Sequence, residues 1–233
     1  GRAIVFNPAN ASHPWSSIPK TASARYGAAA IGLGGKLYVL GGRVGDPAVE
    51  TVEMFEPGAY VWTMVRSMNR KRSYHAVAAL DGRIYALGGF AKTYDSSRHW
   101  QENKYVEAYV VSENKWYNQA NMQQYRMHFK AAAIGGKVYA VGGTGNRHNK
   151  GGAMNTVEAY DPVLNGWSYV SPMTSKRHYQ YVFVMSGRIF AVGGHDGAAW
   201  TSTVEAYDPS VDEWSMVPSM AHPWGDVRGY QIA

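Results

Sequence analysis

The chain contains 233 residues, of which 45% are hydrophobic and 17% charged, so it has enough apolar material for a folded core. It has no cysteine, which excludes disulfides, cysteine-ligated zinc or iron–sulfur sites and a cysteine nucleophile. The formal net charge of +6 mildly favours an acidic partner. No apolar run reaches the roughly 18 residues that cross a bilayer, so we expect no membrane partner.

The first 24 residues contain Phe6-Asn7-Pro8 followed by Trp15. The same order returns later as Tyr160-Asp161-Pro162 followed by Trp167. We therefore expect residues 1–24 to form two strands that correspond to the second half of a repeated unit.

Two markers recur along the rest of the chain with a common period. Glycine pairs that follow an apolar run begin at residues 41, 88, 142 and 193, and tryptophans stand at 62, 116, 167 and 214. The glycine pairs are 47, 54 and 51 residues apart, and a period of about 50 is typical of a propeller blade. The repeat predicts blades at 25–71, 72–125, 126–176 and 177–227.

Each repeat is expected to form four antiparallel strands. In residues 72–89 an apolar run leads to Asp81-Gly82, a dipeptide suited to the positive φ angles of a tight hairpin turn, and a second run ends at the glycine pair. A variable loop, a strand containing a glutamate and a strand containing a tryptophan follow. Such sheets bury both faces only when they stack around an axis.

Arginine and glutamate also recur, in phase with the glycine pairs and the tryptophans. A carboxylate within an apolar strand is costly unless it is paired, so we expect each arginine to pair with a glutamate of the same or the next blade, and the tryptophans to lie between blades. The alternative for the arginines is ligand contact. The residues are Arg25, Arg72, Arg126, Arg177, Glu53, Glu107, Glu158, Glu205, Trp62, Trp116, Trp167 and Trp214.

The combined pattern of Gly-Gly, Val-Glu-aromatic-Asp-Pro, Trp, Met and Arg resembles the kelch repeat. Residues 55–57 and 109–111 depart from the aromatic-Asp-Pro motif, and the last linker has Arg228 four residues late. The resemblance implies an all-β, kelch-type β-propeller with four complete four-stranded blades. A composite or incomplete fifth blade would combine residues 1–24 with a first strand at 228–233. The alternative is a fragment of a six-bladed propeller.

Function is expected in the variable loops, since the strands repeat and the loops do not. In kelch domains these loops share a face with the linkers between blades, which would give a basic, aromatic surface suited to an acidic or turn-forming peptide. Ordinary solvated loop residues are the alternative. The candidate contact residues are Arg70, Lys71, Tyr94, Arg98, His99, Trp100, Arg147, His148, Lys176, His178 and Trp200.

The sequence offers little support for catalysis, and we assign no catalytic residue, metal or cofactor. The eight histidines form no metal-ligand doublet, and His75, His128 and His178 fall out of register, which favours structural roles. The copper site of galactose oxidase, which also has a kelch-type propeller, needs a cysteine. An iron site that uses Asp95, His195 and Asp196 stays open.

The leading hypothesis is a protein-interaction module. The resemblance implies either the substrate-recognition domain of a ubiquitin-ligase adaptor, joined to cullin machinery through a BTB region, or an actin-binding scaffold, in either case cytoplasmic. The alternatives are a metal-dependent or sugar-processing kelch enzyme, with its site on the loop face, and a protein that binds an acidic polymer. Nucleic-acid binding is not expected.

Overall fold

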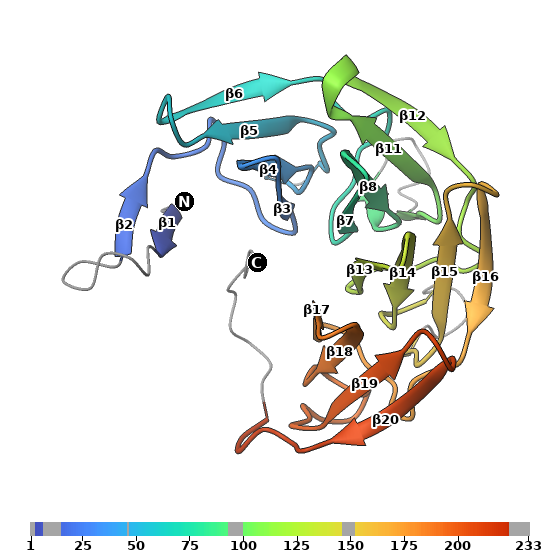
Figure 1. The fold of residues 1–233 in the computed structure, drawn as a ribbon. Coiled ribbons are helices and arrows are strands. Elements are labelled where there is room, and N and C mark those ends of the chain that lie inside the picture. The colour runs from blue at the N-terminus through green and yellow to red at the C-terminus, as the bar shows by residue number, and fades with distance from the viewer. Residues whose placement is uncertain (1–2, 7–14, 46, 93–99, 146–151, 224–233) are drawn as a thin grey trace.

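The computed structural model describes residues 3–6, 15–45, 47–92, 100–145 and 152–223, and these residues are almost entirely strands and turns (Figure 1). Within these ranges no helix is long and apolar enough to cross a membrane.

Four antiparallel sheets of four strands follow one another along the chain. Their strands, in blade order, are β3 (Ala29–Leu33), β4 (Lys36–Leu40), β5 (Val52–Glu56) and β6 (Val61–Val65); β7 (Ala76–Leu80), β8 (Arg83–Leu87), β11 (Val106–Val110) and β12 (Lys115–Gln119); β13 (Lys130–Ile134), β14 (Lys137–Val141), β15 (Val157–Asp161) and β16 (Gly166–Val170); β17 (Tyr181–Met185), β18 (Arg188–Val192), β19 (Val204–Asp208) and β20 (Glu213–Val217). The first strand of each sheet lies innermost and the fourth outermost, so the all-β propeller expectation is confirmed (Figure 1).

The turns between the first two strands of each blade have the expected geometry. Asp81 and Gly82 have φ angles of 49° and 71°, and Ser186 and Gly187 have φ angles of 49° and 74°. Two consecutive positive φ angles define the primed turn whose twist matches that of the flanking strands.

Neighbouring blades pack through tyrosines of their middle strands. Tyr85 of β8 contacts Tyr160 of β15, with ring centroids 5.7 Å apart, and Tyr38–Tyr109 and Tyr139–Tyr207 repeat the contact at the other two interfaces. The hydrophobic core is therefore divided into three clusters, each between two adjacent blades.

The repeated tryptophans also link neighbouring blades. The indole N–H of Trp116 donates to the Arg66 carbonyl of the preceding blade at 2.8 Å. Trp167 and Trp214 donate in the same way at 2.9 Å, to Ala120 and Ser171. Only Trp116 is fully buried, while Trp62, Trp167 and Trp214 are half-buried, so these rings cover the rim of each interface and fix its register by a hydrogen bond.

Residues outside the four four-stranded sheets form a few shorter elements. The expected loop at 90–105 contains a hairpin, and a single 3-10 turn lies where residues 109–111 depart from the repeat. These elements are β1 (Ala3–Phe6), β2 (Trp15–Ile18), β9 (Phe90–Lys92), β10 (Trp100–Glu102) and η1 (Val111–Glu113).

The strands β1 and β2 pair with each other and lie beside the first blade, where Pro19 accepts the Trp62 indole N–H at 2.7 Å. The described blades form an arc (Figure 1).

On the side face of the fourth blade Phe183 is 40% exposed, whereas its counterparts Ala78 and Ala132 are 3% and 7% exposed. The first strand expected at 228–233 lies outside the described residues.

Candidate functional site

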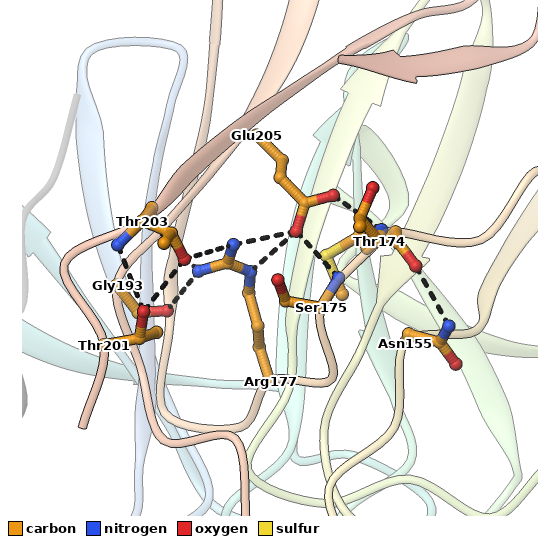
Figure 2. Close-up of polar contacts among 9 residues, drawn as sticks. Asn155, Thr174, Ser175, Arg177, Gly193, Thr201, Thr203 and Glu205 are labelled. Atoms are coloured by element: carbon orange, nitrogen blue, oxygen red, sulfur yellow. Dashed lines mark hydrogen bonds and ion pairs between the residues drawn. The ribbon is translucent and has the colours of Figure 1, made fainter. Parts of the chain in front are cut away.

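A buried arginine supports the base of the variable loop in each blade. In the fourth blade the Arg177 guanidinium donates to the carbonyls of Gly193 and Thr203, both at 2.9 Å, and to Glu205 at 2.8 Å (Figure 2). Glu205 in turn accepts the backbone N–H of Thr174, in the preceding linker, at 2.6 Å. The ion pair thus ties the loop and the linker to one strand.

The other blades repeat this ion pair between an arginine and a glutamate of the same blade. The pairs are Arg25–Glu53, Arg72–Glu107 and Arg126–Glu158. Burial lowers the pKa of the Arg72 guanidinium, and the Glu107 carboxylate opposes that shift. Burial raises the pKa of Glu205, but hydrogen bonds from Arg177 and two backbone N–H groups outweigh it and leave the pKa below its usual range. These side chains lie inside the blades and form no part of the loop surface.

The loops and the linkers between blades lie at the same end of the blades. The backbone N–H of Met68, in a linker, donates to the Glu50 carbonyl in the neighbouring loop at 3.0 Å. Met122, Met173 and Met220 donate to Lys104, Asn155 and Ser202 at corresponding positions. We call this end of the blades the loop face.

Four residues on the loop face connect the blades around the axis, and we call Gly27, Tyr74, His128 and Tyr179 the axial ring. Each stands two residues after a repeated arginine, and their φ angles lie between 52° and 63°. Tyr74 N–H donates to Gly27 at 2.7 Å, His128 N–H to Tyr74 at 3.1 Å, and Tyr179 N–H to His128 at 2.9 Å. The main chain alone therefore holds three large rings next to one another.

The aromatic side chains of the axial ring are in direct contact. Tyr74 and His128 have centroids 4.6 Å apart, and His128 and Tyr179 have centroids 4.4 Å apart. Phe90 stacks on Tyr74 with its centroid at 5.4 Å. Aromatic side chains arranged in this way give a rigid contact surface at a low cost in conformational entropy.

A second group of rings, the fourth-blade cluster, consists of His178, Tyr179, His195 and Trp200. His178 has its ring centroid 4.9 Å from Tyr179 and 5.1 Å from His195. Trp200 lies 5.1 Å from His195 and 6.2 Å from Tyr179, which closes the circuit. Tyr179 and Trp200 are 46% and 39% exposed, so the cluster presents aromatic surface to solvent.

In the first blade an arginine stands at the position that His195 occupies in the fourth blade. Arg43 directly follows the glycine pair, as His195 does in the fourth blade, and its guanidinium carbon lies 5.4 Å from the Tyr26 centroid and 5.8 Å from the Phe90 centroid. In the linker after the first blade, the guanidinium carbon of Arg70 lies 3.7 Å from the Tyr105 centroid. Arginine over an aromatic ring is thus a repeated contact on this face.

Two histidines have pKa values below the ordinary value. Burial lowers the pKa of His178, and the neighbouring His195 lowers it further. His75, which is fully buried between the first two blades, has its pKa lowered to about 3, mainly by burial and then by Arg72 and Lys130. Both rings are therefore neutral at pH 7.

The structure describes only some of the contact residues expected from the sequence. Arg70, Lys71 and Lys176 are exposed in the linkers of the loop face, and His178 and Trp200 meet in the fourth-blade cluster. For Trp100 the structure gives the backbone of β10 alone. Tyr94, Arg98, His99, Arg147 and His148 lie outside the described residues.

Sequence reasoning missed the other residues of these contacts, which are the exposed Tyr26 and Tyr179, the half-buried Tyr74 and His195, and the buried Arg43 and Phe90. A signal was available. Aligning the repeats on their arginines shows Gly27 in the first blade and Tyr74, His128 and Tyr179 at the same position in the others. Glycine at this position in one repeat is compatible with a positive φ, and large rings in the other three indicate a shared aromatic position.

Within the residues that the structure describes, no group of three or more histidine, cysteine, aspartate or glutamate side chains could hold a metal ion. Asp95, one of the three candidate iron ligands, lies outside those residues.

Comparison with known families finds the kelch motif at residues 24–69, 71–123, 125–174 and 177–221, so the chain belongs to the kelch-repeat family. It is 29% identical over 163 residues to Kelch-like protein 26 of Danio rerio, a match that covers 68% of this chain and 25% of that protein. It is 28% identical over 190 residues to Kelch-like protein 23 of Pongo abelii, covering 79% of this chain and 31% of that protein.

A solved structure titled "Structure of YjhT" superposes with a TM-score of 0.75 at 16% identity, covering 88% of this chain and 69% of the other. That likeness supports the fold. The chain spans between a quarter and a third of the length of the two curated relatives named above.

Proposed function

We propose that this chain is a protein-interaction module that binds a partner protein or peptide through its loop face. The observation that carries the proposal is the rigid aromatic surface formed by the axial ring and the fourth-blade cluster. Binding energy at protein interfaces concentrates in such tyrosine and tryptophan side chains. Because buried ion pairs hold the loop bases and linkers, the surface is already formed before a partner arrives.

The relatives are named Kelch-like proteins, and the resemblance to their repeats supports a more specific proposal. We propose that the module recognises substrates for a cytoplasmic ubiquitin-ligase adaptor and reaches cullin machinery through a BTB region elsewhere in the parent protein. An actin-binding scaffold is the second setting. Exposed Lys71 and Lys176 on the loop face, with the net charge of +6, favour a partner that is acidic overall.

The proposal is tested by quantitative affinity capture with matched surface variants. Tyr179→Ser and Trp200→Ser each remove an exposed ring from the loop face, whereas Val163→Ser removes a side chain that is 91% exposed in a turn at the opposite end of the blades. We expect one set of proteins to be captured by the wild type and Val163→Ser and to be lost with either loop-face variant. Equal capture by all four proteins, at equal melting temperatures, would refute binding through this face.

The same captured proteins separate the finer proposals. An acidic partner predicts weaker capture by Lys71→Glu combined with Lys176→Glu, and weaker capture by the wild type as salt rises. Co-sedimentation with filamentous actin tests the scaffold setting. Accumulation of the captured proteins when the parent gene is silenced tests the adaptor setting.

A further inference from the structure

The fourth-blade cluster differs from the chain's other aromatic contacts in what its polar atoms do. The indole N–H groups of Trp62, Trp116, Trp167 and Trp214 all donate to backbone carbonyls. The indole of Trp200 makes no hydrogen bond within the described part of the chain, and its ring is 39% exposed. Within the described residues it therefore makes no inter-blade hydrogen bond of the kind formed by the other four tryptophans, and part of its ring faces solvent.

A carboxylate stands at the edge of this cluster. Asp196 follows His195, and its Oδ1 accepts the backbone N–H groups of Ala198 and Ala199 at 2.7 and 2.8 Å. These hydrogen bonds lower its pKa, so it is anionic throughout the neutral range. Asp161 and Asp208 pair with Lys137 and Arg188, but Asp196 forms no ion pair with any residue that the structure describes.

At the corresponding positions of the first blade, an arginine side chain lies over aromatic rings. Tyr26 and Arg43 stand at the repeat positions of His178 and His195, each at an isolated bridge between the start of the first strand and the end of the second. There the guanidinium of Arg43 lies over the rings of Tyr26 and Phe90. In the fourth blade both positions carry histidine rings. The fourth blade therefore offers an aromatic face at the position where the first blade has its own cation, Arg43.

We propose that the fourth-blade cluster is a binding site for an arginine side chain of the partner, with its guanidinium over Trp200 and His195 and its charge balanced by Asp196. This inference rests on the proposed function, since it names one chemical group that the partner carries. A guanidinium suits the site because it is planar, stacks on aromatic faces and remains charged at all relevant pH values.

A titratable histidine within the site, His178, makes the binding sensitive to acid. The titratable groups around His178 are His195, Asp196 and Tyr179, with His128 on the far side of Tyr179. At neutral pH the His178 ring is uncharged. Protonation of His178 places a positive charge beside the guest, so the arginine leaves as pH falls, whereas a carboxylate guest would bind more tightly.

The test uses purified protein and short peptide probes, so it does not depend on knowing the partner. One probe is acetyl-Gly-Ser-Arg-Ser-Gly-amide, and its matched control carries citrulline, a neutral isostere of arginine; a third peptide carries glutamate. Nuclear magnetic resonance follows the indole N–H of Trp200, which Trp200→Phe identifies. We expect saturable shifts with the arginine peptide at pH 7.5 and about tenfold weaker binding of the citrulline peptide, as a cation–π contact of ordinary strength implies.

Variants that copy residues of the other blades separate the contribution of the aromatic faces from that of histidine protonation. His178→Tyr with His195→Phe installs the rings found at these positions in the first two blades, Tyr26 and Phe90. We expect this double variant to bind the arginine peptide at pH 7.5 and to bind it as well at pH 5.5, while the wild type binds several-fold more weakly at pH 5.5. Asp196→Asn should weaken binding severalfold at both pH values.

Several results would overturn the inference. They are equal binding of the arginine and citrulline peptides, preference for the glutamate peptide, or a Trp200 signal that no peptide shifts. If the double variant does not fold, His178→Tyr alone should still reduce the loss of binding at pH 5.5, and an unchanged loss would refute the histidine mechanism. If these probes fail while affinity capture still depends on Tyr179 and Trp200, the proposed interaction surface stands and the arginine site falls.

Discussion

Replacing His75 by phenylalanine should make the protein more resistant to acid. His75 stands three residues after Arg72, and Phe129 and Gln180 occupy the same position in the next two blades. Its ring packs against Gly41 of the preceding blade, as Phe129 packs against Gly88. Neither ring nitrogen of His75 has a hydrogen-bond partner among the described residues, so the fold already accepts an apolar ring here and gains nothing from the histidine nitrogens.

The expected size of the effect follows from proton linkage. The pKa of His75 falls from 6.5 to about 3 in the folded protein, so the unfolded chain binds a proton that the folded protein excludes. The histidine therefore imposes no penalty above pH 6.5, and stability is lost as pH falls from 6.5 towards 3. At pH 5 the loss is about 2 kcal/mol, from 1.36 kcal/mol per pH unit over the 1.5 units below 6.5.

The measurement is urea denaturation of wild type and His75→Phe at pH 7.5 and pH 5.0. The difference in unfolding free energy between the two proteins should grow by about 2 kcal/mol in favour of the variant at pH 5.0. Other groups titrate equally in both proteins and cancel. His222→Gln, which removes an exposed histidine, provides the control and should leave the pH dependence unchanged. A parallel pH dependence of wild type and His75→Phe would refute the reasoning.

Three further substitutions test the scaffold. Glu158→Gln leaves the buried Arg126 guanidinium without its charge partner and should lower the unfolding free energy by about 3 kcal/mol in urea denaturation; a loss below about 0.5 kcal/mol would contradict a structural ion pair. Gly142→Ala places a Cβ 2.7 Å from a backbone carbonyl of the next blade, at a φ of 59°, so its melting temperature should fall by several degrees, whereas Gly58→Ala, which meets nothing within 4 Å, should not change it. Trp167→Phe removes the indole N–H that reaches the preceding blade and should destabilise by about 1 kcal/mol, again measured in urea; an unchanged midpoint would show that the hydrogen bond contributes nothing.

The blades were predictable because each strand has a local cause that repeats. The Asp81-Gly82 and Ser186-Gly187 turns require positive φ, and the sequence supplies residues that tolerate it. The period of about 50 residues then identifies the architecture. The hairpin β9–β10 was not predictable, since the segment at 90–105 has no counterpart in the other repeats and lacks the turn dipeptide that marks the other hairpins.

The candidate surface was harder to predict because it depends on geometry between blades. Net charge and loop composition directed attention to basic residues, of which Arg70 is placed on the face of Tyr105. Trp200 was expected at the surface, but its contact with His195 comes from residues folded back within one loop. The histidines at 75, 128 and 178 are out of register with one another, yet His128 occupies the same repeat position as Tyr74, two residues after its blade's arginine.

The axial ring also has a consequence for how a partner is oriented. The three hydrogen bonds that join Gly27, Tyr74, His128 and Tyr179 use main-chain atoms only, so the backbone repeats from blade to blade while the side chains differ. The pseudo-rotational symmetry of the scaffold is thereby broken at the surface that we propose binds a partner. A partner lying across the axis meets a glycine, a tyrosine, a histidine and a tyrosine in a fixed sequence, and a rotation by one blade would place every one of its groups against the wrong neighbour.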